Sequence, residues 1–241
     1  MSEAVRLAKR VVELLGCSRQ EAEQYIQGGW VLVDGEPMDE PQSRIVPEQV
    51  VQLDLGATLA ATEPATILLH KPAGSDWGTS ASPAAPLLTS ATRWEQDGSG
   101  TRQLRRHFQR LTALMPLEAT ASGLLVFTQD PRLLRRMRED ASRLEQEFNV
   151  EVSGEIAPYG LRRLAHGLSF QGRNLPPSKV SWQNETRLRF ALKDVREGQL
   201  AAMCADVGLT AVSMKRIRIG RVPLAKVPVG QWRYLPASER F

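Results

Sequence analysis

The chain has 241 residues, of which 42% are hydrophobic and 24% are charged, and its formal net charge is +4. Such a length holds one domain of medium size and a small one, each with an apolar core. No run approaches the roughly 18 consecutive apolar residues of a membrane-spanning helix, and the N-terminus lacks the apolar core of a secretion signal. The two cysteines, Cys17 and Cys204, have no nearby histidine pair, so we expect no metal site and no disulfide framework. We therefore expect a soluble, cytoplasmic protein.

Positive charge is unevenly distributed along the chain. Residues 1–55 contain five Lys or Arg and ten Asp or Glu, a net charge of −5, whereas residues 56–241 contain 26 and 17, a net charge of +9. A broad electrostatic surface for nucleic acid therefore has to lie mainly on the second part. The densest basic region is 102–143, where nine Arg stand against four acidic residues. Arg in preference to Lys suits bidentate phosphate binding, although a solubilising surface is the alternative.

The first 55 residues have the patterns of a small helical and hairpin domain. Gly16 ends a helical stripe of apolar residues, and Ser18 with Glu21 forms a capping-box pattern for a second helix. Asp34-Gly35 predicts a hairpin turn. The expected elements are, in chain order, a helix over 5–15, a helix over 19–27, a strand over 30–33 and a strand over 46–55.

This order of elements resembles the alpha-L (S-four) RNA-binding domain over about fifty residues. The matching residues are Arg6-Leu7, Cys17-Ser18-Arg19, Ala22, Ile26, Gly29, Val31, Val33 and Gly35. The resemblance implies an RNA-binding domain at 1–56, joined by a linker at 57–65 to a second domain at 66–241. Its candidate phosphate contacts are Arg6, Lys9, Arg10 and Arg19. A solvated helix face is the alternative for these four side chains.

The second domain begins with an apolar strand over 66–70, followed by Lys-Pro-Ala-Gly at 71–74. Residues 74–100 have no periodic apolar pattern, so we expect a long loop that is either mobile or functional. Apolar spacing then predicts a helix over 102–114. His107 in this stretch suits packing or phosphate contact better than catalysis.

The stretch 114–130 is the one around which the rest can be understood. Its loop carries a single carboxylate, Glu118, and runs into the apolar residues 124–127, which predict a buried strand. The stretch resembles the signature of the RNA pseudouridine synthases that modify ribosomal RNA, through Leu117, Thr120, Gly123, Leu124, Leu125, Thr128 and Asp130. Met115, Pro116 and Glu118 stand where that family has Gly, Arg and the catalytic Asp.

The remaining chain alternates helices and strands. The expected elements are a helix over 131–144, a strand over 148–152, a helix over 161–168, strands near 168–171, 178–182 and 186–192, a helix over 199–206 and a strand over 215–219. In the last strand, alternation places Arg216 and Arg218 on one face. Further family-like stretches lie at 197–198, 215–220 and 228–235, so the resemblance runs from about residue 5 to 236.

The resemblance implies an α+β fold, with a mixed, mainly antiparallel sheet flanked by helices. It also implies an RNA uridine-to-pseudouridine isomerase without cofactor, in which Glu118 takes the position of the family Asp and Phe148 that of a family Tyr. Ala201 and Ala202 stand where the family has paired Arg. The candidate RNA contacts in this domain are Lys71, Arg105, Arg106, Arg135, Arg136, Lys215, Arg216 and Arg218. We expect Glu118 at the floor of a positively lined groove.

Three functions are compatible with these residues. Glu118 is longer than Asp by about 1.5 Å, and misplacement by about 1 Å can cost on the order of a hundredfold in rate. The leading hypothesis is therefore a monomeric protein that binds structured, ribosomal RNA with impaired or absent catalysis. An active ribosomal RNA pseudouridine synthase using Glu118 is the first alternative. A protein-interaction module without RNA is the second, supported only by the acidity of residues 1–55.

Overall fold

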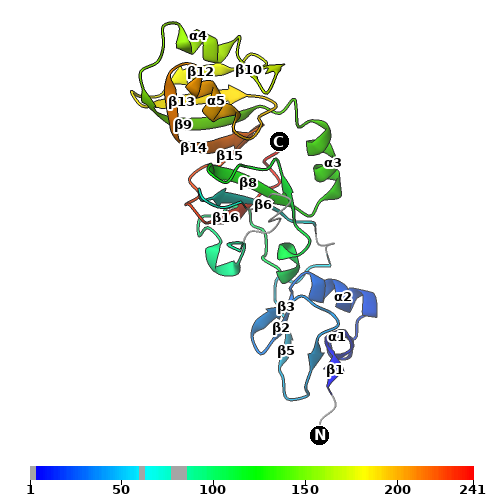
Figure 1. Cartoon of the computed structure of the whole chain (residues 1–241). Coiled ribbons are helices and arrows are strands. Elements are labelled where there is room, and N and C mark those ends of the chain that lie inside the picture. Colours follow the sequence, from blue (N-terminus) through cyan, green and yellow to red (C-terminus); the bar gives the residue numbers. More distant parts are fainter. Residues whose placement is uncertain (1–3, 60–62, 77–85) are drawn as a thin grey trace. The chain divides into compact units, whose positions relative to one another are not determined.

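The chain divides into two compact units in the computed structural model, which describes residues 4–59, 63–76 and 86–241. Unit 1 consists of residues 1–64 and 101–109, and unit 2 of residues 65–100 and 110–241 (Figure 1). None of the helices in the described ranges is long and apolar enough to cross a membrane.

Unit 1 is built from two helices and short antiparallel strands. Its elements are β1 (Val5–Arg6), α1 (Leu7–Leu15), α2 (Arg19–Gln27), β2 (Val31–Val33), β3 (Glu36–Met38), β4 (Arg44–Ile45) and β5 (Val51–Leu53). The strands pair as β3-β2-β5 and as β1-β4. Their apolar sides and those of the helices form one core: Leu7, Ala8, Val11, Ala22, Ile26, Val31, Val33 and Ile45.

Local signals in unit 1 act as the sequence predicts. Ser18 and Glu21 form a reciprocal capping box, because the Ser18 hydroxyl accepts the Glu21 N–H and the Glu21 carboxylate accepts the Ser18 N–H. Asp34 and Gly35 both have positive φ, 53° and 86°, and join β2 to β3 in a two-residue turn. The expected first helix starts two residues late, because Val5–Arg6 pairs with β4 instead.

The expected helix over 102–114 is wrong. A short 3₁₀ turn, η2 (Arg105–Phe108), forms there instead, and the strand β7 (Thr112–Leu114) follows. The reason is that its apolar residues are divided between two cores: Leu104 is buried in unit 1, whereas Leu114 joins the core of unit 2. Helical spacing did not show that these residues belong to different units.

Arg102 fastens the segment 101–109 within unit 1. Its guanidinium pairs with Asp54 at 3.0 Å and lies 4.5 Å from the centre of the Trp30 ring. Leu104 packs so closely on Gly29 that a Cβ on this glycine would come within 2.5 Å of the leucine methyl group. Unit 1 is therefore completed by a segment distant in sequence.

We expect Arg102→Ala to destabilise unit 1, by about 1 kcal/mol for the combined loss of a partly exposed ion pair and a cation–π contact. Arg105→Ala is the matched control, because Arg105 is an exposed arginine of the same segment. Hydrogen exchange of the unit 1 amides, measured as a function of temperature, would report the effect on the stability of unit 1. Equal stability of the two variants would show that Arg102 does not fasten the segment.

Unit 2 is a twisted sheet with three helices. In its described part nine strands form one sheet, in the order β12-β13-β9-β14-β8-β6-β16, with β15 beside β14 and β7 beside β8. The strands are β6 (Thr66–Lys71), β7, β8 (Ser122–Thr128), β9 (Gln146–Gly154), β12 (Lys179–Trp182), β13 (Arg187–Leu192), β14 (Leu209–Ile219), β15 (Val222–Pro223) and β16 (Trp232–Tyr234), and a separate hairpin joins β10 (Ser169–Phe170) to β11 (Arg173–Asn174). Among these strands only β14 and β8 pair in parallel, so the expected mixed, mainly antiparallel sheet is confirmed.

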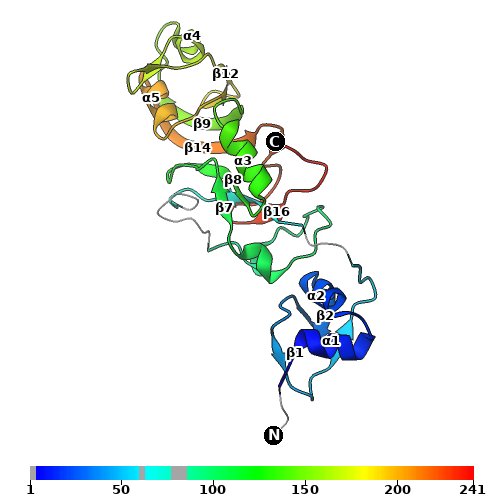
Figure 2. The ribbon, with the colours of Figure 1, turned by 90° about the vertical axis from the view of Figure 1, so that its right-hand side faces the viewer.

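In the part of unit 2 that the structure describes, three helices flank the sheet. They are α3 (Pro131–Glu139), α4 (Gly160–Ala165) and α5 (Gln199–Ala205). The helix α3 packs on β7 and β8, α4 on β12, and α5 on β14 (Figure 2). The predicted α+β architecture is confirmed, and the helix expected over 131–144 ends earlier, at Glu139.

The expected loop over 74–100 is only partly described, because residues 77–85 lie outside the described ranges. Its later part forms a short 3₁₀ turn, η1 (Ser90–Thr92), and packs on β16. The Trp232 indole N–H donates to the Thr89 carbonyl at 2.9 Å, and the Arg93 guanidinium lies 4.9 Å from the Tyr234 ring centre. This part of the loop therefore supports the edge of the sheet.

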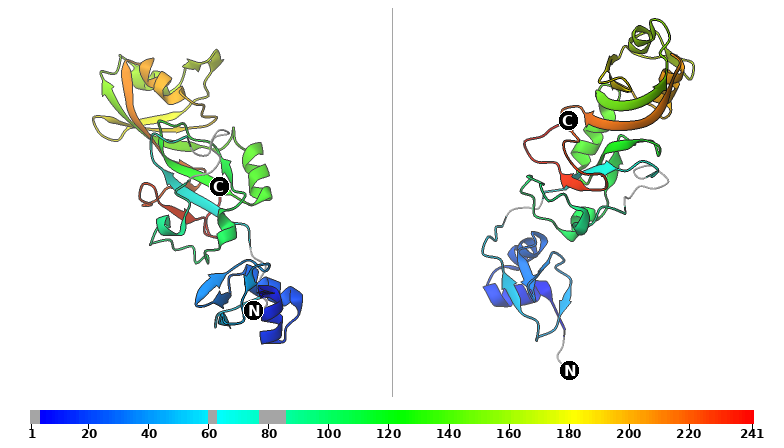
Figure 3. Two further views of the ribbon diagram at one scale, coloured as in Figure 1. Left: turned by 60° about the horizontal axis from the view of Figure 1, so that its bottom comes forward. Right: turned by 90° about the vertical axis from the view of Figure 1, so that its left-hand side faces the viewer.

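The two halves of the sheet meet where β14 crosses β8. Figure 3 shows β14 (orange) as a long, curved strand that runs beside β9 and reaches β8. The contact between β14 and β8 consists of two residue pairs, Lys215 with Ser122 and Arg216 with Gly123. Gly123 has φ +112°, and a Cβ there would lie 2.2 Å from the Arg216 carbonyl oxygen. The crossing therefore requires glycine.

We expect Gly123→Ala to destabilise the fold by more than the roughly 1–3 kcal/mol of backbone strain alone, because its methyl group would overlap the β14 backbone. Gly167→Ala is the control, since Gly167 has φ +100° and an added Cβ would meet nothing within 4 Å. Urea unfolding of both variants would compare the two costs. If the two variants lost equal free energy of unfolding, backbone strain and not the close strand crossing would explain why residue 123 is glycine.

Candidate functional site

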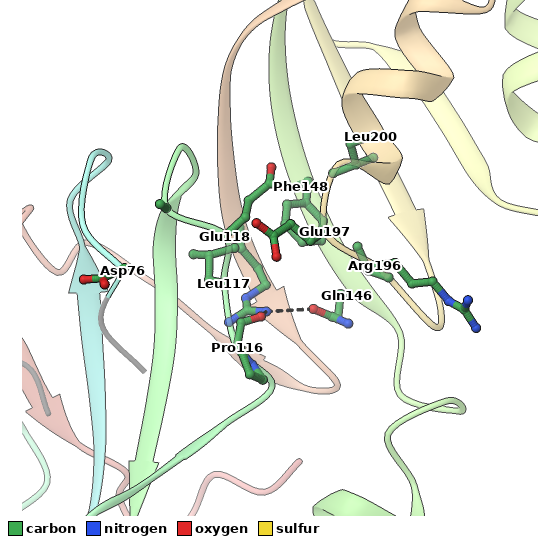
Figure 4. Close-up of a pocket in the computed structure, with 12 residues that line it drawn as sticks. Asp76, Pro116, Leu117, Glu118, Gln146, Phe148, Arg196, Glu197 and Leu200 are labelled. Atoms are coloured by element: carbon green, nitrogen blue, oxygen red, sulfur yellow. Dashed lines mark hydrogen bonds between the residues drawn. The ribbon is translucent and has the colours of Figure 1, made fainter. Parts of the chain in front are cut away.

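A pocket of about 320 Å³ opens in unit 2 beside the loop that carries Glu118 (Figure 4). Its apolar wall is formed by Pro116, Leu117, Ala119, Phe148, Val195 and Leu200. Its polar residues are Asp76, Glu118, Gln146, Arg196, Glu197 and Arg216. The two candidate catalytic residues, Glu118 and Phe148, are thus brought together from the loop before β8 and from β9. Phe148 is 3% exposed, so its ring forms part of the pocket wall.

The Glu118 carboxylate is held by the main chain. Its Oε2 accepts a hydrogen bond of 2.8 Å from the N–H of Gly198, which precedes α5 and has φ +74°. None of the ion pairs among the described residues involves Glu118. The acid is therefore oriented by a neutral donor rather than by a guanidinium.

Arg216 lies inside the protein, against the loop that carries the acid, and is 1% exposed. Its guanidinium donates to the carbonyl oxygens of Met115 (2.8 Å), Pro116 (3.4 Å) and Leu124 (2.8 Å) and to Oε1 of Gln146 (2.9 Å). Burial lowers the pKa of Arg216 to about 9, so the side chain stays charged at neutral pH. Carbonyl and amide oxygens compensate a charge that no carboxylate neutralises here.

Lys71 holds the other side of the same loop. It is fully buried, and its ammonium donates to the carbonyl oxygens of Pro72 (3.2 Å), Ala119 (3.2 Å) and Ala121 (2.7 Å). Burial, followed by the nearby charge of Arg216, lowers the pKa of Lys71 to about 8. All three hydrogen-bond donors of the ammonium group are therefore directed to backbone carbonyls of the protein itself.

Lys71 and Arg216 together support the acid loop, which we define as residues 115–121. One cation binds carbonyl groups before Glu118 and the other binds carbonyl groups after it. Both were predicted as RNA contacts, and their placement contradicts this prediction. A phosphate cannot reach side chains that are buried and already hydrogen bonded.

Arg218 does not share a face with Arg216, contrary to the alternation expected for β14. The register along β9 shifts between them, since Arg216 lies opposite Phe148 and Arg218 opposite Glu147. A β-bulge therefore separates the two arginines and turns their side chains differently. Arg218 binds Glu147 and also Glu145 at 2.6 Å, and its hydrogen bond lowers the pKa of the Glu147 carboxyl group.

The remaining candidate RNA contacts of the second half are more accessible. Arg105, Arg135 and Arg136 are exposed, whereas Lys215 and Arg106 are partly buried. The two α3 arginines have only long ion pairs of 3.9 Å, to Glu139 and Asp140. Exposed pairs of this length contribute little energy, so both guanidinium groups are available to another anion.

In unit 1, three of the four candidate phosphate contacts line one groove. Arg6, Lys9 and Arg19 lie there together with Arg44, whereas Arg10 does not line it. Arg44 joins the groove because β4 pairs with β1, which places Arg44 opposite Arg6. Sequence inspection missed Arg44, since only strand pairing brings it beside the first helix.

The pocket differs from the positively lined groove that was expected around Glu118. Three carboxylates line it, those of Asp76, Glu118 and Glu197, and one of its two guanidinium groups is buried. Within the described ranges no group of three or more His, Cys, Asp or Glu is placed to hold a metal ion. Sequence inspection also missed Arg196 as a pocket residue, although it directly precedes the family-like stretch at 197–198.

We expect the stability difference between wild type and Lys71→Met to depend on pH. Below about pH 8 the folded and unfolded chains both carry the Lys71 proton, and the buried charge costs stability. Between pH 8 and the ordinary lysine value of 10.5 the unfolded chain binds more protons, so the free energy of unfolding of wild type rises relative to the variant. Urea unfolding at several pH values would measure this, with exposed Lys226→Met as the control; a difference that falls as the pH rises would contradict it.

Comparisons with known proteins agree with this geometry. Residues 5–51 match the S4 domain model. The dual-specificity RNA pseudouridine synthase RluF of Escherichia coli (strain K12) is 26% identical over 238 residues, which cover 98% of this chain and 77% of RluF. Ribosomal small subunit pseudouridine synthase A of the same organism is 25% identical over 242 residues, which cover 98% of this chain and 98% of that protein. The chain is thus similar to RNA pseudouridine synthases over nearly its whole length.

A solved structure shares the fold of this chain. The crystal structure of a pseudouridylate synthase matches 97% of this chain and 97% of its own, with a TM-score of 0.56 and 19% sequence identity. An uncharacterized RNA pseudouridine synthase of Aquifex aeolicus is 24% identical over 98% of this chain. The expected resemblance to RNA pseudouridine synthases and the N-terminal S4 domain are therefore confirmed, whereas the roles of individual site residues stay predictions.

Proposed function

We propose that this chain is a ribosomal RNA-binding protein of the pseudouridine synthase family whose uridine isomerisation is impaired or absent. The observation that carries this proposal is the environment of Glu118: its carboxylate accepts the Gly198 N–H, and no ion pair among the described residues includes it. The proposal places the protein in the cytoplasm as a monomer, where it would meet ribosomal RNA.

Catalysis by one carboxylate depends on its position to a fraction of an ångström. Glu118 has one methylene more than the family Asp, and Gly198 fixes its longer side chain from one side. Pro116 supplies no side-chain donor at the pocket, and α5 presents Ala201 and Ala202 where the family has arginines. Several such changes reduce the rate together, because each loosens or displaces the same reacting groups.

RNA binding needs none of this accuracy. Unit 1 offers a groove with three of its predicted contacts, and α3 offers exposed arginines with weak internal partners. Phosphate binding by such side chains depends on charge and on release of counterions. The S4 domain and relatives that are named RNA pseudouridine synthases support the same function. We infer that RNA binding has been retained while the demand on the catalytic acid was relaxed.

A second candidate, an active synthase that uses Glu118, is favoured by one observation. The acid loop is firmly supported by Lys71 and Arg216, and the pocket beside it is open. A site that has lost all selection for chemistry has no evident need for such support. The two candidates differ in whether RNA treated with the protein contains additional pseudouridine.

We expect wild type and Glu118→Ala to leave equal amounts of pseudouridine in ribosomal RNA, measured by isomer mapping of RNA from cells with and without the gene. Glu118→Asp, which restores the family's shorter acid, tests whether the rest of the site is still competent. A pseudouridine that wild type restores and Glu118→Ala does not would refute the impaired-catalysis proposal and establish the second candidate.

Binding is measured separately. Wild type should bind structured ribosomal RNA with an affinity that falls as salt rises, with a slope of about −0.9 for each phosphate contact in a duplex. Glu118→Ala should bind as well as wild type, because it changes no predicted phosphate contact. Failure of wild type to bind at low salt would remove the RNA-binding proposal.

A further inference from the structure

Arg196 lies at the pocket, just before α5, and was not among the predicted RNA contacts. Of the two guanidinium groups that line the pocket, that of Arg216 is buried and donates to four oxygen acceptors. The Arg196 side chain is 33% exposed. Among the described lining residues it therefore supplies the cation that solvent and a ligand can reach.

The main chain of Arg196 is tied to the acid. Its N–H donates to the Gln199 side-chain oxygen at 3.1 Å, and its carbonyl accepts the Gln199 N–H at 3.1 Å. Two residues later, the Gly198 N–H binds the Glu118 carboxylate at 2.8 Å. Hydrogen bonds therefore hold the turn 196–198 at a defined place beside Glu118, while the Arg196 side chain extends from a fixed base.

The guanidinium itself is only weakly engaged. It forms an ion pair with Asp194 at 3.6 Å, and the Asp194 side chain is 53% exposed. An exposed pair with this separation is worth about 0–1 kcal/mol. Figure 4 shows the guanidinium directed away from the Glu118 carboxylate. The guanidinium can therefore exchange Asp194 for another anion while the main chain of Arg196 stays in place beside the pocket.

The charge around the pocket makes this cation necessary for RNA. Asp76 and Glu197 are exposed and lie beside the pocket with Glu118, and Asp194 is close by. Among the described lining residues, the accessible side chains other than Arg196 are neutral or negative, and the negative ones repel a polyanion. An RNA strand that enters the pocket thus needs a positive group at this position.

We propose that Arg196 binds the backbone phosphate next to the nucleotide whose base enters the pocket. The inference rests on the proposed RNA-binding function and names one residue that performs it. The planar guanidinium can donate two parallel hydrogen bonds to a phosphate, which an ammonium cannot do. The ligand class is a single-stranded or unpaired segment of RNA, because only a base outside a helical stack can enter such a pocket.

The experiment compares salt-dependent binding of a short, uridine-containing single-stranded RNA by wild type, Arg196→Ala and Arg162→Ala. Arg162 is the control because it is an exposed arginine on α4 that does not line the pocket. Arg196→Ala should weaken binding several-fold and reduce the salt slope by about 0.7, the value for one contact to a single strand. Arg162→Ala should leave the slope unchanged.

Two further variants separate charge from geometry. Arg196→Lys keeps the charge and loses the planar donor pair, so it should bind between wild type and Arg196→Ala. Asp194→Asn removes the internal competitor of the phosphate, so binding should be equal to that of wild type or tighter. Weaker binding by Asp194→Asn would overturn the inference, because the internal pair would then be what matters.

The outcomes distinguish the two proposals. If wild type binds the RNA and Arg196→Ala matches Arg162→Ala, the Arg196 inference is overturned while the RNA-binding function stands. If wild type binds neither this RNA nor structured ribosomal RNA, the RNA-binding function fails and the inference fails with it. Thermal unfolding of each variant shows whether it is folded, and Arg196→Lys supplies the comparison should Arg196→Ala be unstable.

Discussion

The close crossing of β14 and β8 at Gly123 is the constraint on which the site depends. It joins the two halves of the sheet through two residue pairs and leaves no room for a side chain on Gly123. It also places Arg216 of β14 against the acid loop, while Lys71, the β6 partner of Gly123, lies on the other side. The strand crossing therefore also determines where the loop that carries Glu118 is held.

Two buried cations without a carboxylate partner are costly unless the protein supplies other acceptors. Here the acceptors are mainly carbonyl oxygens of the acid loop and its neighbours. Desolvation is thereby compensated by the same hydrogen bonds that fix the loop. A change of side chain at Met115, Pro116 or Glu118 leaves these acceptors in place, because backbone carbonyls do not depend on side-chain identity.

The sequence separation of the interacting residues explains which expectations were correct. The helix over 19–27 and the turn at 34–35 were correct because a capping box and a two-residue hairpin involve neighbouring residues. The helix over 102–114 was wrong because Leu104 and Leu114 serve different cores. Glu118 and Phe148 line one pocket, whereas Lys71 and Arg216 are buried, and a sequence does not show whether a basic side chain is buried.

The amino-acid sequence by itself determined the capped helix at 19–27 and the turn at 34–35 through local patterns, and it indicated the α+β class and the S4 domain through motifs that resemble known RNA-binding proteins. Only the tertiary structure decided which arginines face inward, that a bulge separates Arg216 from Arg218, and that Arg196 lies beside Glu118. Burial and strand register depend on contacts between residues distant in sequence. The free energy of each charged group therefore depends on the folded environment and not on its place in the chain.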